Sequence, residues 1–424
     1  MSTSAFRTLF LVVLACSATV ARTQENSCSL LVPRYVFDGT DLLSDRVVLI
    51  VNDTIAAVGP VAEVSVPGGC AVQAFPEGTL LPGMIEGHAH LLLHPYNETS
   101  WNDQVLRESH AERAIRGGVH ARESLRAGFT TVRDLGSEGA GYTDVGLKQA
   151  IEKGVIPGPR MIVAGRAIVA TGSYGPAGFA DHVAVPLGAE PADGNEGLTR
   201  VVRDQIGHGA DVIKVYADYR WGPERTARPT FTQEELETIV RVAESSGRRV
   251  VAHAATAEGM RRATLAGVST IEHGDGGTPE VFALMAERGV ALCPTLAAGD
   301  AILQYGGWRK GVDPEPDRIV GKRRSFADAL AAGVTIVAGG DVGVFPHGDN
   351  VRELELMVDY GMEPVEVLRS VTSGNAEVFG IRDRVGRVQA GLLADLVLVN
   401  GNPTENISVL REVLLVWKGG RIVK

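Results

Sequence analysis

The chain lacks several features that are typical of other functional classes. No run of Lys and Arg offers a phosphate-binding footprint, and the 424 residues carry a formal net charge of −10, which argues against nucleic acid as a partner. No two of its four cysteines have the spacing of a zinc–thiolate site. No apolar stretch is as long as a membrane-spanning helix, so we expect no stable membrane span. The length exceeds that of one ordinary domain and suits a large domain with an accessory one.

The first 21 residues have the pattern of an export signal. Arg7 precedes an apolar core over residues 9–15, and small residues follow up to Ala21, where residues 19–21 fit a cleavage site. We therefore expect a periplasmic or secreted mature protein. Residues 13–16 faintly resemble a lipoprotein box, so lipid anchoring through Cys16 is the alternative.

Loss of this signal would leave only three cysteines in the mature chain. Cys28 and Cys70 flank strand-like segments, and an oxidising compartment would allow a disulfide between them. Cys293 lies inside an apolar run and is expected to be a buried thiol.

The most informative segment follows an apolar run over residues 79–85 and ends in Gly87-His88-Ala89-His90. Because side chains alternate along a strand, His88 and His90 point to the same side at the end of that strand. Two neutral imidazoles on one face form half of a site for a transition metal. The pair alone is a weak indicator, and its value depends on further ligands at the ends of later strands.

Eight β-rich runs alternate with stretches that resemble loops and helices. They cover residues 80–90, 129–134, 160–168, 212–216, 249–253, 269–273, 290–294 and 334–341. Several are continuous in Val, Ile and Ala, as in parallel strands that are covered on both faces. Between two of them, Thr232 followed by Glu235 predicts a capping box at the start of a helix. This alternation predicts an α/β protein with a (β/α)8, TIM-like barrel, whose reactive groups lie at the C-terminal strand ends.

Polar residues collect at these predicted strand ends, each closing an apolar run. They are His88, His90, Lys214, His253, His273 and Asp341. Because a barrel interior penalises an unpaired charge, this placement favours a functional role over a structural one.

The two flanks of the chain contain short β-like pieces joined by turns. Residues 28–79 and residues 386–424 are each too short to enclose a core alone. We therefore expect one small β-sandwich domain made from both chain ends, with the barrel, residues 80–385, inserted between them.

Six short motifs, met in this order, carry a resemblance to a known family. They are residues 81–90, 130–134, 213–215, 252–254, 271–274 and 340–341. With them the chain resembles the metal-dependent amidohydrolase superfamily over nearly everything after its first 28 residues. It is similar to the binuclear branch of imidazolonepropionase-like proteins, Xaa-Pro and Xaa-Arg dipeptidases and ochratoxin-hydrolysing amidohydrolases.

The resemblance implies two divalent metal ions, expected to be Zn²⁺, and a metal-bridging hydroxide that attacks an amide carbonyl. It assigns one metal to His88, His90 and Asp341, and the second to His253 and His273. A desolvated, neutral Lys214 can add carbon dioxide, and its carboxylated form is an anionic bridge suited to two metals. Asp341 would take a proton from the hydroxide and pass it to the departing amine.

The loops that follow the strands supply candidates for substrate contact. Tyr219 is expected to hydrogen-bond the tetrahedral oxyanion, and Arg220 to bind a C-terminal carboxylate. Tyr174 stands where relatives often carry a histidine, which puts the carboxylate contact of the family in doubt. His347 and His182 are further candidates, although a structural role for His347 is an equal alternative.

These features favour an exported, carboxypeptidase-like amidohydrolase that cleaves the C-terminal amide bond of dipeptides or N-acyl amino acids, ochratoxin-type amides included. The alternatives are a cyclic-amide hydrolase of the imidazolone type and a catalytically silent binding protein on the same scaffold. Export favours the first, because it suits the scavenging of peptides. The expected partner is a small-molecule substrate, and the resemblance also implies a homo-oligomer.

Overall fold

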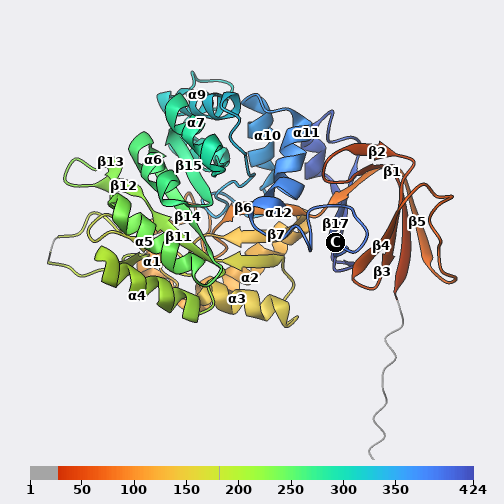
Figure 1. Cartoon of the computed structure of the whole chain (residues 1–424), viewed down its shortest axis with the longest axis horizontal. Helices are drawn as coiled ribbons and strands as arrows, with labels where there is room; N and C mark the ends of the chain where they lie inside the picture. The colour runs from red at the N-terminus through yellow and green to blue at the C-terminus, as the bar shows by residue number, and fades with distance from the viewer. Residues whose placement is uncertain (1–26, 181) are drawn as a thin grey trace, which may run out of the picture.

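The computed structural model of the chain describes residues 27–180 and 182–424. The predicted export signal and Cys16 lie outside these residues. In the described part, no helix combines the length and apolar character needed to cross a membrane. Figure 1 shows a sheet at the right-hand end of the molecule and a larger part to its left, in which helices surround parallel strands.

Strands from both ends of the chain form one mixed sheet, here called the end sheet. It comprises β1 (Cys28–Phe37), β2 (Leu42–Ser44), β3 (Val47–Val51), β4 (Thr54–Gly59), β5 (Ala71–Pro82), β17 (Leu396–Asn400), β18 (Val413–Lys418) and β19 (Arg421–Ile422). The order is β19-β18-β17-β5-β1-β3-β4, with β2 beside β1. Hydrogen bonds between β5 and β17 thus join the first and last parts of the chain. The predicted arrangement of these strands as a two-layered β-sandwich, and the predicted domain boundaries, stay predictions.

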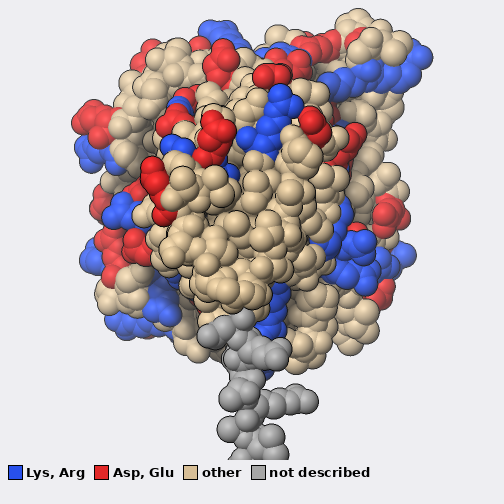
Figure 2. All heavy atoms as spheres, turned by 90° about the vertical axis from the view of Figure 1, so that its right-hand side faces the viewer, with Lys and Arg blue, Asp and Glu red and all other residues tan. Residues whose placement is uncertain are grey.

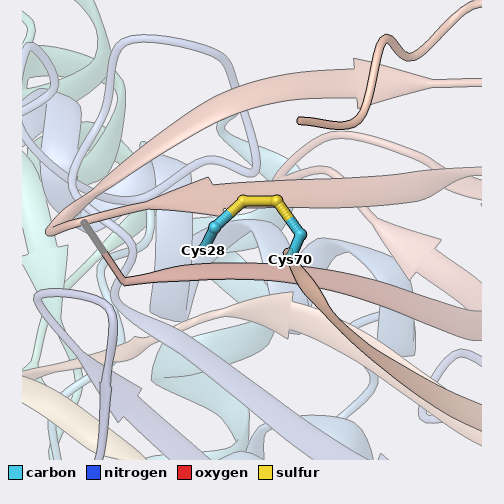
Figure 3. Close-up of a disulfide and its surroundings, with 2 residues drawn as sticks. All are labelled: Cys28 and Cys70. Atoms are coloured by element: carbon cyan, nitrogen blue, oxygen red, sulfur yellow. A yellow bond between two sulfur atoms is a disulfide. The ribbon is translucent and has the colours of Figure 1, made fainter. Parts of the chain in front are cut away.

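Apolar side chains cover both faces of the end sheet. Along β1, Leu30 and Leu31 belong to two different buried clusters, as the alternation of a strand requires. The larger cluster includes Trp417 from β18. A disulfide between Cys28 and Cys70 joins the start of β1 to the residue before β5, which confirms the predicted pairing (Figure 3). Cys293 is a buried free thiol, as predicted.

The parallel strands of the larger part each overlap a predicted run, except the short strand Glu190–Pro191, which was not predicted. They are β6 (Met84–Ala89), β7 (Phe129–Asp134), β8 (Arg160–Val163), β9 (Ile168–Val169), β10 (Glu190–Pro191), β11 (Val212–Tyr216), β14 (Arg249–Thr256), β15 (Thr270–Gly276) and β16 (Ala291–Cys293). One sheet has the order β6-β7-β8 and the other β10-β9-β11-β14-β15-β16. The predicted third strand is divided into β8, which pairs with β7, and β9, which pairs with β11. All residues of β7 and β11 are buried, because helices cover the outer face of parallel strands.

The prediction of a regular eighth strand over residues 334–341 is wrong. This segment forms isolated β-bridges to its neighbours instead. Ile336 bridges to β16 at Leu292, and Val342 bridges to β6 at Ala89, both in parallel. Between these bridges the chain passes so close to β6 that a Cβ on Gly339 would lie 2.5 Å from the His88 nitrogen. Asp341 then adopts a left-handed conformation (φ 62°), which ends any strand geometry.

Helices alternate with these strands and pack around them (Figure 1). They are α1 (Trp101–Arg107), α2 (His110–Arg126), α3 (Thr143–Glu152), α4 (Gly194–Gly207), α5 (Gln233–Glu244), α6 (Ala257–Ala266), α7 (Pro279–Arg288), α8 (Leu296–Tyr305), α9 (Asp317–Ala331), α10 (Val351–Asp359), α11 (Pro364–Arg369) and α12 (Asn375–Val378). A π-helical turn (Ser370–Gly374), a 3-10 turn (Ile407–Arg411) and the hairpin β12 (Asp218–Trp221) and β13 (Thr226–Pro229) complete the fold. The predicted capping box at Thr232 and Glu235 is present at the start of α5.

Figure 2 shows the end of the molecule that lies to the right in Figure 1. Acidic and basic side chains are interspersed around an area that carries neither. Charge of one sign therefore does not dominate this face.

Candidate metal centre and cavity

The six predicted ligands converge at the C-terminal ends of the parallel strands. His88 lies in β6 with His90 just after it, Lys214 lies in β11, His253 in β14 and His273 in β15, and Asp341 lies in the irregular segment beside β6. The ring centroids of His90 and His88 are 5.3 Å apart, those of His88 and His273 5.2 Å, and those of His273 and His253 4.4 Å. The strand order thus places the four imidazoles side by side.

Asp341 faces the first pair of imidazoles. Its Oδ1 lies 3.3 Å from Nε2 of His90 and 3.7 Å from Nε2 of His88. One ligand atom each of His88, His273 and Asp341 lie within 4.8 Å of one another. These distances bring nitrogen and oxygen donors together around a common point.

Hydrogen bonds behind the imidazoles determine which ring nitrogen is available to a metal. Nδ1 of His90 lies 2.9 Å from the Gly136 carbonyl, which only accepts, so Nδ1 carries the proton and Nε2 is unprotonated in the neutral ring. Nδ1 of His88 lies 2.8 Å from Glu272, and Nδ1 of His273 lies 2.8 Å from the Thr295 hydroxyl. A carboxylate or carbonyl behind a ligating histidine is the usual way to fix its tautomer and orientation.

Glu272 is itself held in the interior by a buried arginine. Arg133 donates to Glu272 at 2.9 Å and to the Gly87 carbonyl at 2.6 Å. Burial opposes ionisation of Glu272, but Arg133 and the hydrogen bond to His88 outweigh it and hold its pKa well below the ordinary range. His88 therefore has an ionised carboxylate behind it.

Burial keeps most of the candidate ligands in the form that binds a cation. It is the main cause that lowers the pKa of His88 to about 4 and that of His253 to about 3, with Lys214 adding to both shifts. Burial favours neutral Asp341, but the neighbouring His88 and His90 lower its pKa to about 2. His90 differs: burial opposes its charged form, but the hydrogen bond and charge of Asp341, together with the charges of Glu138 and Asp134, raise its pKa to about 9.

Lys214 is 1% exposed, and burial lowers the pKa of its ammonium group although Glu272 and Asp341 oppose this effect. A buried amine that loses its charge easily is the form that carboxylation needs. The four imidazoles, one carboxylate and this lysine are a donor set of nitrogen and oxygen. The residues present therefore fit a centre for two divalent ions such as zinc.

The backbone is strained at several residues around the centre. His273, Thr295, Asp341 and Glu138 have φ values of 76°, 49°, 62° and 47°, in the left-handed region that residues with a side chain seldom adopt. Such strain persists only where the surrounding structure enforces it, and it concentrates at functional sites.

Five of the six candidate ligands, all except Lys214, line a cavity of about 380 Å³. Its walls include Tyr96, Glu138, Tyr174, Tyr216, Tyr219, Arg220, Leu296, Ile302, Arg318 and Lys322. Three of the predicted substrate contacts, Tyr219, Arg220 and Tyr174, are thus brought to the site. The ring of Tyr219 lies 5.6 Å from that of His253.

The other two predicted substrate contacts lie elsewhere among the described residues. His347 donates from Nε2 to the Leu93 carbonyl at 3.0 Å, and its ring stacks on that of His120 at 4.3 Å. His182 is exposed in the segment after β9. Neither side chain is among those that line the cavity, and the contacts of His347 are those of the structural alternative.

Sequence reasoning did not identify Glu272, Thr295 or Glu138. Glu272 directly precedes His273, and only the histidine was considered as a ligand from the sequence. Thr295 directly follows the predicted seventh strand. Glu138 lies in the glycine-rich turn after the predicted second strand, the position at which a barrel places reactive groups. Attention to every acidic residue within a few positions of a strand end would have found all but Thr295.

Comparison with known proteins identifies the family of this chain. The model of the Amidohydrolase family matches residues 79–423. The ochratoxinase of Aspergillus niger is 30% identical over 444 residues, which cover 96% of this chain and 88% of that protein. A crystal structure of a Xaa-Pro dipeptidase with methionine bound in its active site is 31% identical, with a TM-score of 0.82 over 93% of this chain and 99% of that one. The crystal structure of A. niger ochratoxinase has a TM-score of 0.78 at 28% identity, over 94% of this chain and 96% of that one.

Proposed function

The chain belongs to the amidohydrolase family and is a hydrolase that acts on C–N bonds, and we propose that it cleaves the C-terminal amide bond of dipeptides or N-acyl amino acids. The observation that carries this proposal is that the ligand cluster and Arg220, which makes no ion pair with a described residue, line one cavity. Arg318 and Lys322 line it too, but both pair with Asp275. A hydrolytic centre and a place for a carboxylate are thus within the reach of one small substrate. The similarity to a Xaa-Pro dipeptidase supports a dipeptide substrate, in which the scissile amide lies next to the C-terminal carboxylate.

We propose that the parallel strands form the (β/α)8 barrel that was predicted from the sequence. The two bridges of residues 334–342 support this, because they connect β16 to β6, the last strand to the first. In such a barrel the C-terminal strand ends share one mouth, and loops there can vary without disturbing the core. Substrate choice would then depend on the loops that carry Tyr174, Tyr219 and Arg220.

We propose that His88, His90 and Asp341 hold one divalent ion, that His253 and His273 hold a second, and that carboxylated Lys214 bridges the two. When bound, two such ions, expected to be Zn²⁺, make hydroxide available near neutral pH and polarise the substrate carbonyl. Buried Lys214 supports the bridge, since its ammonium form would repel two cations.

The remaining roles belong to residues of the cavity. Asp341, whose lowered pKa keeps it ionised, would accept the proton of the attacking nucleophile at a carboxylate oxygen and deliver it to the amide nitrogen that leaves. The hydroxyl of Tyr219 would donate to the oxygen on which negative charge develops. Arg220 makes no ion pair with a described residue, so its guanidinium would be available to the substrate carboxylate.

We propose that the protein is exported, with a periplasmic or secreted mature form. The Cys28–Cys70 disulfide supports this, since disulfides persist in oxidising compartments. Lipid attachment at Cys16 stays the alternative and is tested by the mass of the mature N-terminus. Assembly into a homo-oligomer also stays a prediction, which light scattering of the purified protein would test.

The decisive experiment is an assay of zinc-loaded protein against a library of dipeptides and N-acyl amino acids. We expect hydrolysis of linear amides that have a free C-terminal carboxylate, and little hydrolysis of their C-terminal amides. Activity confined to cyclic amides or lactones would contradict the proposal and support an imidazolone-type hydrolase. Fewer than one zinc per chain together with no hydrolysis would support a silent binding protein instead.

A further inference from the structure

Glu138 is a buried carboxylate that the roles given above do not use. It lies between β7 and α3, is 3% exposed, and belongs to the cavity wall. The indole nitrogen of Trp101 donates to its Oε2 at 2.8 Å, and the hydroxyl of Tyr174 donates to the same oxygen at 2.7 Å. Its carboxylate makes no ion pair with any residue in the described ranges. Arg113 and His90 interact with this charge only from beyond ion-pair distance. A buried carboxylate that lacks a direct cationic partner is costly, so a cation of the substrate would find an unpaired acceptor here.

The backbone that presents Glu138 is held in place by a buried arginine. Arg113, 1% exposed, donates to the Glu138 carbonyl at 2.6 Å, to the Ser137 carbonyl at 3.1 Å and to the Leu92 carbonyl at 3.0 Å. Glu138 itself has a φ of 47°, which costs free energy for a residue with a side chain. Arg113 thus enforces a strained turn whose effect is to direct a carboxylate to the cavity.

Aromatic rings surround the same part of the cavity. The ring of Tyr174 lies 4.9 Å from that of Tyr216 and 4.9 Å from that of Tyr219, and Tyr96 lines the cavity with them. The faces of aromatic rings attract cations, and a carboxylate among them adds a charged acceptor. This combination recognises an ammonium group.

We infer that Glu138 binds the α-ammonium group of the substrate, so that dipeptides with a free N-terminus are preferred to N-acyl amino acids. The inference rests on the proposed function and narrows its substrate class. A dipeptide carries its ammonium group on the acyl side of the scissile bond and its carboxylate on the amine side. Glu138 and Arg220 line one cavity and offer a complement to both charges, whereas Arg318 and Lys322 in the same cavity pair with Asp275.

The test compares two substrates that differ only in this charge. They are glycyl-X and N-propionyl-X, where X is the C-terminal residue most readily released in the dipeptide library, because a methyl group replaces the ammonium group at nearly constant shape. Wild-type protein should have a kcat/KM for glycyl-X at least about 10-fold higher than for N-propionyl-X, since the methyl group cannot donate a charged hydrogen bond to Glu138. Glu138→Gln should lower kcat/KM for glycyl-X by about 10-fold or more and change that for N-propionyl-X by less than about 3-fold.

Tyr174→Phe is a graded second variant, because it removes one of the two donors that hold Glu138 and leaves the charge of the carboxylate. It should reduce the preference for glycyl-X by less than Glu138→Gln does. Equal losses on both substrates in Glu138→Gln would show a purely structural role and overturn the inference. Equal kcat/KM values of the wild-type protein for both substrates would also overturn it and leave the proposed function standing. Failure of the wild-type protein to cleave either substrate, or any linear amide, would overturn both.

Discussion

The end sheet and the ligand-bearing strand ends use β-structure in opposite ways. In the end sheet, buried side chains are mainly apolar, and a disulfide joins the start of β1 to the residue before β5. The left-handed residues Asp45 and Asn52 lie in turns between strands. At the strand ends of the larger part, buried histidines, carboxylates and a lysine lie together, and residues such as His273 and Asp341 are left-handed inside the site. The first arrangement favours stability, whereas the second accepts strain and buried charge.

The difference indicates where substitutions should affect activity and where they should affect stability. Buried charge and backbone strain cost free energy and persist where they serve binding or chemistry. A functional centre can therefore be distinguished from a structural sheet by its buried charges and strained backbone as well as by its residue types. The predictions below separate the two regions, beginning with the largest effect.

Asp341→Asn should have the largest effect on activity. Asparagine tolerates the left-handed backbone at this position but cannot accept a proton or serve as an anionic ligand. We expect kcat/KM to fall by about 10³-fold or more, which combines the loss of a metal ligand with that of an acid–base group. The free energy of unfolding, measured with urea on the metal-free protein, should change by less than about 1 kcal/mol. Retention of activity within 10-fold would assign the proton transfer to another group.

Lys214→Ala should be nearly as damaging. Loss of the bridge should lower the metal content and reduce kcat/KM by about 10²-fold or more, since an anionic ligand shared by both ions is removed. Short carboxylates such as acetate or propionate should restore part of the activity, because they can occupy the place of the carbamate. A variant that keeps two metals per chain and full activity without added carboxylate would contradict the carboxylated lysine.

Replacement of both Cys28 and Cys70 by serine should lower the stability of the protein and leave its activity nearly unchanged. The disulfide closes a loop with a sequence separation of 42. Its loss should lower the free energy of unfolding by about 2–4 kcal/mol, because the unfolded chain gains conformational freedom. The variant's kcat/KM should remain within about 2-fold of wild type, since the end sheet contributes no residue to the cavity wall. A comparable loss of activity would show that the two regions are coupled.

Glu353→Gln should have the smallest effect and should depend on pH. Glu353 in α10 accepts hydrogen bonds from the backbone nitrogens of Leu296 and Ala297, yet burial raises its pKa to about 8. The folded protein therefore binds a proton that the unfolded chain, with a pKa of about 4.5, releases. Its contribution to stability is complete below about pH 4.5 and is lost as the pH rises toward 8.

Titration of unfolding with urea between pH 4.5 and 8 tests this prediction. The free energy of unfolding of wild-type protein should decline relative to that of Glu353→Gln by on the order of 1–3 kcal/mol over this interval. Parallel curves for the two proteins would show that Glu353 keeps the same protonation state in the folded and unfolded chains.

Much of the fold and of the ligand set could be predicted because the signals are local. The apolar run and the polar residue that closes it are adjacent in sequence, so β7 and β11 were predicted with the bounds that the structure has. The capping box at Thr232 is likewise complete within four residues. The irregular geometry of the eighth segment could not be predicted from the sequence, because the close approach of Gly339 to His88 depends on a contact between distant parts of the chain.

The sequence by itself determined the residue types and their periodicity: which strands are covered on both faces, and which strand ends carry His88, His90, Lys214, His253, His273 and Asp341. These follow from side-chain chemistry and from alternation along one segment. Only the tertiary structure decided that Glu272 supports His88 across 184 positions, and that Arg113 and Tyr174 direct Glu138 to the cavity. Such contacts join separate loops and strands, and no local pattern specifies their distances.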